Sequence, residues 1–370
     1  MKKLILILLL LTSFYSISTG ENAQRYAVIK LTKTVNPIMA EHIVDSLKKA
    51  RNDKVAFIII QMDTPGGMLQ ATRDIIKAIM NTEKNDIPVV VYTYPRGAQA
   101  ASAGGFIMLS AHVAAMAPGT EIGAMHPVSP QLNFSKKDKK GKPSGVMEKK
   151  VLNDTMAYGR SLAQKRNRNV KWVENAIKNA ISSSYKEALA VGIIDFIADD
   201  MDDLITKLNN RKVKINGKIK ILKTQGLIAK EYNMNWKQSF LNYFAQPQIV
   251  MLLLLIAIVG IGIEFKSPGM IFPAAIGGVA LILFLMAVSI LPINIVGVLL
   301  IVLSIVLFIL ELYFTSYGFL TLGGIVSFII GSMIFIDTPL QGGGIPLPYI
   351  IGTVIVLLAF IFIVVRAVIK

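Results

Sequence analysis

The sequence predicts an α/β domain followed by an all-α membrane domain with several spans, and three observations support this fold class. First, 53% of the 370 residues are hydrophobic and only 17% are charged, which is more apolar than an ordinary soluble domain. Second, apolar runs typical of strands alternate with amphipathic helical patterns up to about residue 208. Third, the stretch from Ala245 to Lys370 contains only six charged residues. The apolar excess therefore belongs to the C-terminal third of the chain.

The N-terminus, "MKKLILILLLLTSFYSISTG", has two lysines, an apolar run and then small and polar residues. This layout predicts a secretory signal peptide over residues 1–20, since the run is short for a spanning helix; an uncleaved anchor is the alternative. Either way, the domain that follows is expected on the extracytoplasmic side of the cell membrane. The chain has no cysteine, which excludes disulfides and thiolate sites, and we predict no cofactor or metal.

The α/β domain is predicted over residues 21–230. Apolar patterns predict strands over 25–31, 54–62, 88–94, 113–117 and 193–198. Helical spacing of apolar residues predicts helices over 37–53, 68–82, 148–168, 170–180 and 185–192. This alternation is typical of right-handed β-α-β units and a parallel sheet. A hairpin is expected around Asn216-Gly217, because this dipeptide suits a two-residue turn.

The C-terminal part is predicted as an amphipathic interfacial linker over 231–246 and a membrane domain over 247–370. Trp236, Phe240, Tyr243 and Phe244 give the linker its aromatic side, which is typical of a membrane interface. Turn residues divide the tail into five spans, 247–264, 269–291, 293–315, 318–336 and 347–367. Each is close to the roughly 20 residues that a spanning helix needs, and an outside domain with five spans puts Lys370 inside.

Two features of the tail indicate an anchor rather than a transport path. Glycine-rich patches, "AAIGGVAL" and "TLGGIVSFIIGS", suit close packing between membrane helices. The carboxylates of Glu264 and Glu311 lie at the ends of predicted spans, where a charged side chain reaches the interface at little cost.

The net charge of +16 does not indicate nucleic acid binding. Thirteen Lys/Arg and four Asp/Glu lie between Ser135 and Lys178, in a stretch that begins with "SKKDKKGKPSG". No aromatic residues interleave the lysines of that "SKKDKKGKPSG" segment for base stacking. We predict a solvated basic loop near anionic lipid headgroups, and no nucleic acid partner.

Ser102 is the candidate nucleophile. It lies in the small-residue stretch "GAQAASAGGFIML" and begins a predicted helix just after the strand over 88–94. Unpaired amides at a helix start can stabilise an oxyanion, and the N–H of Ala103 is the first such donor. A second turn, "MDTPGG", leaves the neighbouring strand in the same direction. Gly66 and Gly67 therefore add amides at the same edge of the sheet.

The identity of the general base stays open on the residues alone. His42 lies in the first helix, and His112 ends the helix that Ser102 begins, roughly 15 Å away at the helical rise. His126 is possible, but no buried carboxylate is evident to orient it. The other candidate is a lysine that burial keeps neutral, as in Ser–Lys hydrolases; composition does not select which lysine.

Together, "MDTPGG", "PRGAQAASAGGFIMLSAHVAAMAPGTEIGAMHPV", "EKKVLNDTMAYGRSLAQKRNRNVKWVENAIK" and "EALAVGIIDFIAD" resemble the NfeD family of membrane-bound serine proteases. That family is related to signal peptide peptidase A and, more remotely, to Clp protease and crotonase. The resemblance implies a Clp/crotonase-like fold and a dyad of Ser102 and Lys150. It also implies an oxyanion hole from the Gly67 and Ala103 amides, with Gly66 and Gly67 binding substrate.

The resemblance further implies a serine endopeptidase that cleaves apolar segments of stomatin-like membrane proteins. A peptide or protein substrate, a stomatin-like protein, membrane lipid and a second copy of this chain are the expected partners. A catalytically weak scaffold for a stomatin-like partner is the alternative. Helical phase favours Lys149 as the base, because it shares a face with Leu152 and Met156, whereas the resemblance favours Lys150. Full-length members add an OB-like β-barrel, which this chain is expected to lack.

Overall fold

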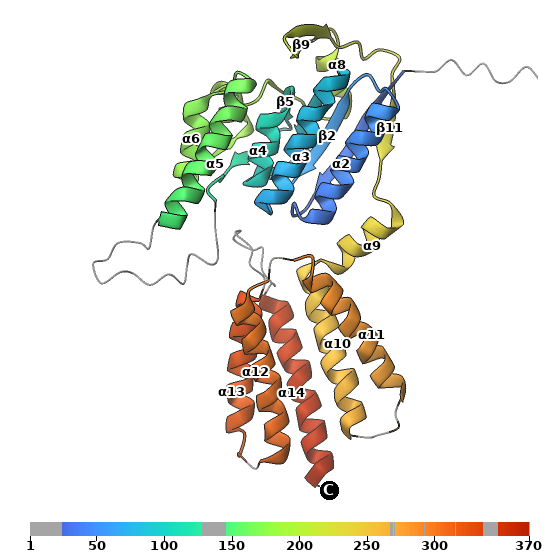
Figure 1. Ribbon diagram of the computed structural model, residues 1–370, viewed down its shortest axis with the longest axis vertical. Coiled ribbons are helices and arrows are strands. Elements are labelled where there is room, and N and C mark those ends of the chain that lie inside the picture. Colours follow the sequence, from blue (N-terminus) through green and yellow to red (C-terminus); the bar gives the residue numbers. More distant parts are fainter. Residues whose placement is uncertain are drawn as a thin grey trace, which may run out of the picture.

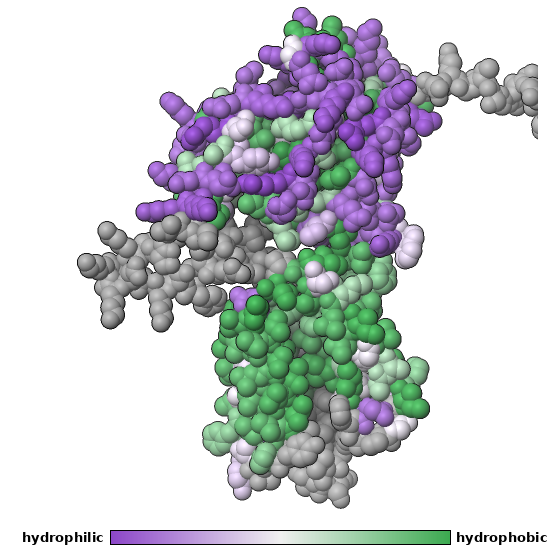
Figure 2. Space-filling view, viewed as in Figure 1, coloured by the Kyte–Doolittle hydropathy of each residue, from purple (hydrophilic) through white to green (hydrophobic). Residues whose placement is uncertain are grey.

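The computed structural model describes residues 24–127, 146–266, 269, 271–291, 293–314, 316–335 and 347–369. It has a hydrophilic α/β domain and a bundle of apolar helices, joined through helix α9 (Figure 1; Figure 2). The predicted order of an α/β domain and an all-α domain is therefore confirmed. The predicted signal peptide and the segment "SKKDKKGKPSG" lie outside the described residues.

The main sheet has six strands, all parallel, in the order β11-β1-β2-β3-β5-β8. They are β1 (Arg25–Thr32), β2 (Ile58–Asp63), β3 (Val89–Thr93), β5 (Val113–Met116), β8 (Phe196–Ile197) and β11 (Ile228–Tyr232). In the central register Ile60 lies between Ile29 and Val91. The near-continuous apolar runs of β2 and β3 follow from this place in the sheet, because a parallel central strand is covered on both faces.

Alternate residues of the same strands enter two different hydrophobic cores. Ile58 and Ile60 belong to the larger core, with helices α2 (Pro37–Asn52), α3 (Leu69–Asn81), α4 (Ala103–Ser110), α5 (Val146–Lys165) and α6 (Val170–Lys178). Phe57 and Ile59 belong to the second core, with helix α8 (Met201–Leu208) and the hairpin of β9 (Lys212–Ile215) and β10 (Lys218–Ile221). The predicted hairpin is confirmed as an antiparallel pair around Asn216-Gly217.

The sequence missed four short strands. β4 (Gln99–Ala101), β6 (Glu121–Gly123) and β7 (Ser182–Ser184) form a small separate sheet, with helix α7 (Tyr185–Ala190) after β7. These three strands are too short to show a period of two. The fourth is β11, an edge strand with exposed and polar residues, which carries the main sheet to Tyr232, past the expected boundary at 230.

Five apolar helices follow the interfacial segment α9 (Trp236–Phe244). They are α10 (Pro247–Lys266), α11 (Ile271–Val288), α12 (Ile295–Tyr313), α13 (Phe319–Ile334) and α14 (Leu347–Ile369). Their bounds agree with the predicted spans. Of the described helices, α11 is long and apolar enough to cross a membrane alone, with a mean hydropathy of 2.5, and α9 with α10 would qualify as a pair bent by 73°. That all five cross stays a prediction.

Glycines permit the closest helix contacts in this bundle, as their patches predict. A Cβ on Gly277 of α11 would lie 2.8 Å from the backbone nitrogen of Ile261 on α10. A Cβ on Gly331 of α13 would lie 2.9 Å from the Cβ of Leu300 on α12. Helix pairs that approach this closely gain dispersion contacts that lipid cannot supply. At the turn between α12 and α13, Glu311 accepts hydrogen bonds from the Thr321 and Gly318 amides, which is a structural role.

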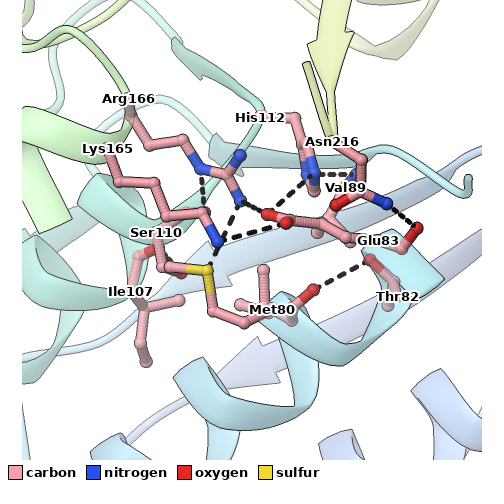
Figure 3. A network of polar contacts seen from close by, with 11 residues as sticks. Met80, Thr82, Glu83, Val89, Ile107, Ser110, His112, Lys165, Arg166 and Asn216 are labelled. Carbon is pink, nitrogen blue, oxygen red and sulfur yellow. Dashed lines mark hydrogen bonds and ion pairs between the residues drawn. The ribbon is translucent and has the colours of Figure 1, made fainter. Parts of the chain in front are cut away.

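A buried polar cluster joins three parts of the α/β domain at the C-terminal end of α4 (Figure 3). Glu83, in the 3₁₀ helix η1 (Thr82–Asn85), pairs with Arg166 at 2.7 Å and with Lys165 at 3.1 Å. Arg166 also donates to the Ser110 carbonyl at 2.9 Å. His112 accepts from the Val89 N–H at Nδ1 over 3.1 Å, so its proton is on Nε2, which faces the Glu83 carboxylate at 3.6 Å.

The cluster makes the stability of the domain depend on pH through His112. Burial, and then the charges of Arg166 and Lys165, lower the pKa of His112 to about 3. The unfolded chain binds this proton near pH 6.5 and the folded chain does not, so stability is full above pH 6.5 and is lost as the pH falls towards 3. Each pH unit in that window removes at most about 1.4 kcal/mol.

We expect the thermal midpoint of the detergent-solubilised full chain, followed by the fluorescence of buried Trp172, to fall between pH 6.5 and 4. In His112→Asn the amide oxygen can still accept from Val89, but nothing at this position titrates, so the slope of the midpoint with pH should decrease. An unchanged slope in that variant would assign the acid sensitivity to other groups.

Candidate active site

Ser102 lies between strand β4 and helix α4, as the residue that caps the helix N-terminus. Its N–H donates to the carbonyl of Gly123 on β6 over 2.8 Å, and its own carbonyl accepts from the Gly105 N–H over 3.1 Å. The serine is therefore fixed by backbone contacts on both sides. Its side chain makes no hydrogen bond to any described residue and it is partly exposed, so the hydroxyl is free to meet a substrate.

The backbone of Ser102 is strained. Its φ is 51° and its ψ is −108°, a combination outside the main regions that L-residues occupy. Such strain costs about 1–3 kcal/mol and is retained mostly where it presents a functional group. Nucleophilic serines of α/β hydrolases occupy a comparable sharp turn between a strand and a helix. The backbone conformation of Ser102 thus supports the sequence-based choice of this residue.

The turn after β2 lies against the Ser102 turn. Thr64 and Ala100 form a parallel bridge, with the Thr64 N–H donating to Gln99 O over 2.8 Å and the Ala101 N–H donating to Thr64 O over 3.1 Å. A Cβ on Gly104 would lie 2.9 Å from the Cγ2 of Thr64. The two turns that the sequence selected, "MDTPGG" and "AASAGG", are therefore brought together in space.

Gly67 is required by a close backbone approach. A Cβ at this position would lie 2.2 Å from the carbonyl oxygen of Val35. Val35 follows β1 and clamps the turn, since its N–H donates to Gly66 O over 2.8 Å and its carbonyl accepts from the Met68 N–H over 2.9 Å. Val35 and Gly123 could not be identified from the sequence, because they act through backbone atoms and no side-chain pattern marks such contacts.

The two turns each contribute an amide that could donate to a substrate, that of Gly67 and that of Ala103. Within the described residues, neither the Gly67 N–H nor the Ala103 N–H donates a hydrogen bond to a protein acceptor. Ala103 is the first residue of α4, so its amide also lies at the positive end of the helix dipole. Both amides are of the kind that stabilises an oxyanion.

The two candidate lysines lie on different sides of the first turns of α5. Both are exposed, and neither makes a hydrogen bond to Ser102 within the described residues. Lys149 shares a side with Leu152 and Met156, which pack against the larger core. Lys150 is one turn from Asp154 on the side that contacts α3. The structure therefore leaves the choice between them open.

The histidines are occupied by local contacts. His42 is buried and lies 3.4 Å from the Ser46 hydroxyl, and burial lowers its pKa. His112 belongs to the Glu83 cluster (Figure 3). His126 has its Nδ1 2.8 Å from the carbonyl oxygen of Ile177; a carbonyl only accepts, so this nitrogen carries the proton and Nε2 is the one left as a base.

Known proteins resemble both parts of the chain. Residues 25–218 match the family model of the NfeD1b N-terminal domain, and residues 248–367 match the model of the NfeD integral membrane domain. Membrane-bound protease PH1510 of Pyrococcus horikoshii is 35% identical over 80% of this chain and 64% of its own. Membrane protein NfeD1b of Bacillus subtilis is 29% identical over 82% of this chain and 66% of its own. The chain thus spans slightly less than two thirds of each relative.

Solved structures also resemble this chain, and one of them contains a bound peptide. It is the 1510-N membrane-bound stomatin-specific protease, as a lysine-to-alanine mutant in complex with a substrate peptide. It is 31% identical, with a TM-score of 0.51, and the match covers 60% of this chain and 97% of that one.

The chain joins a parallel α/β domain, with a strained serine at a helix start, to an apolar helical bundle, and it is a membrane protein. The chain belongs to the NfeD family.

Gly67→Ala should disrupt the turn that carries one of the two expected oxyanion donors, because the added methyl group meets backbone and not a movable side chain. Such overpacking costs about 1–3 kcal/mol. We expect faster hydrogen exchange at the Met68 amide, which the turn holds against Val35. Gly97→Ala is the control, since its φ is +84° but no atom lies within 4 Å of the added carbon. Equal protection of Met68 in Gly67→Ala and the wild type would contradict the clamp.

Proposed function

We propose that this protein is a membrane-anchored serine endopeptidase in which Ser102 is the nucleophile. The observation that carries the proposal is the strained Ser102 at the start of α4, next to a turn whose Gly67 amide donates to no acceptor among the described residues. The Ser102 Oγ attacks the carbonyl carbon of the substrate peptide and gives its proton to a base. The oxyanion accepts hydrogen bonds from the Gly67 and Ala103 amides. The amine product leaves with a proton from the base, and water then hydrolyses the acyl-serine.

The base in this proposal is a lysine on the first turns of α5, with Lys150 preferred and Lys149 as the alternative. Gly66 and Gly67 present backbone to an extended substrate, which binds by strand addition. Catalytic contacts can tighten only when substrate binds, so exposed lysines in the free protein are compatible with the proposal.

The substrate is proposed to be an apolar segment that emerges from the membrane. β11 is parallel to every other strand of the main sheet and continues into α9 and then α10. The carboxyl ends of the strands, where both turns lie, therefore face the helical bundle (Figure 1). Lys33, just after β1, contacts Gln246 at the start of that bundle, with Nζ 3.5 Å from Oε1. A peptide that leaves the bilayer beside the bundle has a short path to this edge.

We propose a stomatin-like membrane protein as the source of this segment, by analogy with the substrate named for the solved relative. The α/β domain is proposed to lie outside the cytoplasm, because a signal-peptide-like segment precedes it. The exposed aromatic side chains of α9, Trp236 and Tyr243, are placed to contact lipid headgroups. The protein is proposed to form a homo-oligomer.

Ser102→Ala should abolish cleavage of an internally quenched apolar peptide by the purified full chain. The helix does not depend on the hydroxyl, because the Ser102 side chain makes no capping hydrogen bond, so the thermal midpoint should stay within a few degrees of wild type. A fluorophosphonate probe should label the wild type at Ser102 and leave Ser102→Ala unlabelled. Cleavage by Ser102→Ala at the wild-type rate would refute the assignment.

The two lysines can be separated by single substitutions. Lys150→Ala should lower kcat by at least about a hundredfold, in line with the 10²–10⁴-fold contribution of a general base, and Lys149→Ala should retain most activity. Both side chains are exposed, so neither change should affect folding. The opposite result would assign the base to Lys149, and two active variants would favour His126.

A further inference from the structure

Side chains near the N-terminal end of α5, which carries Lys149 and Lys150, contact α3 and α4. α3 begins beside the Gly66-Gly67 turn and α4 begins at Ser102. Asp154 on α5 pairs with Arg73 on α3, with Nη2 2.5 Å from Oδ2. The guanidinium of Arg73 also lies over the ring of Tyr158 on α5, 4.8 Å from its centroid. The Tyr158 ring stacks in turn on Phe106 of α4, with the centroids 6.2 Å apart. Four side chains thus join α3, α4 and α5.

On each of the three helices, the first of these four side chains lies about one turn from the end proposed to take part in catalysis. Arg73 is four residues after Leu69, where α3 begins beside the Gly66-Gly67 turn. Phe106 is four residues after Ser102. Asp154 is four residues after Lys150, and four residues are about 6 Å of helix. Arg73 therefore contacts α5 at Asp154, one turn after Lys150, and at Tyr158, where α5 packs on α4.

We propose that Arg73 is a positioning residue of the peptidase, which holds the first turns of α5, and the lysine they carry, in register with Ser102 and the oxyanion turn. This inference rests on the proposed function. Arg73 suits the role because its flat guanidinium can pair with a carboxylate and stack on an aromatic ring at once. Without it, the segment that follows residue 145 would be held to α3 by no other ion pair among the described residues.

The contribution of the Arg73–Asp154 pair to overall stability should be small. The two side chains are 36% and 61% exposed, and exposed ion pairs add little to the free energy of folding. A displacement of about 1 Å in a catalytic group can nevertheless cost a hundredfold in rate. The proposal therefore predicts an effect on kcat that is much larger than the effect on the thermal midpoint.

The test compares Arg73→Ala with Arg160→Ala in the purified full chain. Arg160 pairs with Glu174 of α6 over 2.7 Å and is 45% exposed, so it is a matched ion pair on another side of α5. With the apolar quenched peptide, Arg73→Ala should lower kcat about 10- to 100-fold, with KM within about twofold and the midpoint within a few degrees. Arg160→Ala should keep the wild-type kcat. Arg73→Lys, which keeps the charge without the flat stacking group, should recover part of the loss.

A double mutant identifies the route of the effect. If Arg73 acts through Asp154, then Arg73→Ala/Asp154→Asn should have the same kcat as Arg73→Ala alone, since the second change removes nothing further. A double mutant slower by the product of the two single effects would overturn this route. A kcat loss that is equal in Arg73→Ala and Arg160→Ala, or no loss in Arg73→Ala, would overturn the proposal.

A readout independent of catalysis separates this inference from the proposed function. Hydrogen exchange over residues 149–158 should be faster in Arg73→Ala than in wild type or Arg160→Ala, whether or not the chain cleaves peptides. Unchanged exchange in this segment overturns the positioning role. By contrast, cleavage that survives in Ser102→Ala refutes the proposed function and leaves the exchange result standing as a structural fact about α5.

Discussion

The candidate site depends on one contact, the parallel bridge between Thr64 after β2 and Ala100 in β4. Two backbone hydrogen bonds at this bridge fix the glycine turn relative to Ser102, and the Ser102 amide is fixed from the other side by Gly123 of β6. Backbone hydrogen bonds are short and directional, so they set positions more accurately than exposed side chains can. The strain at Ser102 is tolerated because these contacts over-determine its conformation.

The direction of the sheet decides where this site faces. Because β11 adds to β1 in parallel and leads into α9, the carboxyl ends of the strands lie on the side of the helical bundle. α9 is held against the domain by polar contacts to the N-terminus of α2, where Asn36 at the N-cap position donates from Nδ2 to Asn242 Oδ1 over 3.2 Å. The edge strand and one short helix therefore relate the site to the membrane domain.

The two ends of α4 differ in the charged side chains around them. In the α/β domain, Glu83 pairs with a buried arginine and an adjacent lysine at the far end of α4 from Ser102 (Figure 3). The site end of the same helix has no such cluster among the described residues. At that end the amide of Ala103, the first residue of α4, donates to no acceptor among the described residues. The buried ion-pair cluster and the candidate site thus lie at opposite ends of α4.

The sequence by itself determined the order of domains, the central strands and the two turns that carry Ser102 and Gly67. These follow from hydrophobic periodicity and from local requirements on small residues, which need no knowledge of distant contacts. Only the tertiary structure decided the contacts of Val35, Gly123 and Thr64 with those turns, the small second sheet, and the place of β11. Backbone pairing between segments far apart in sequence leaves no side-chain pattern. The helical phase of α5 was readable from sequence, but the side of α5 that contacts α3 was not, because it depends on how two helices pack.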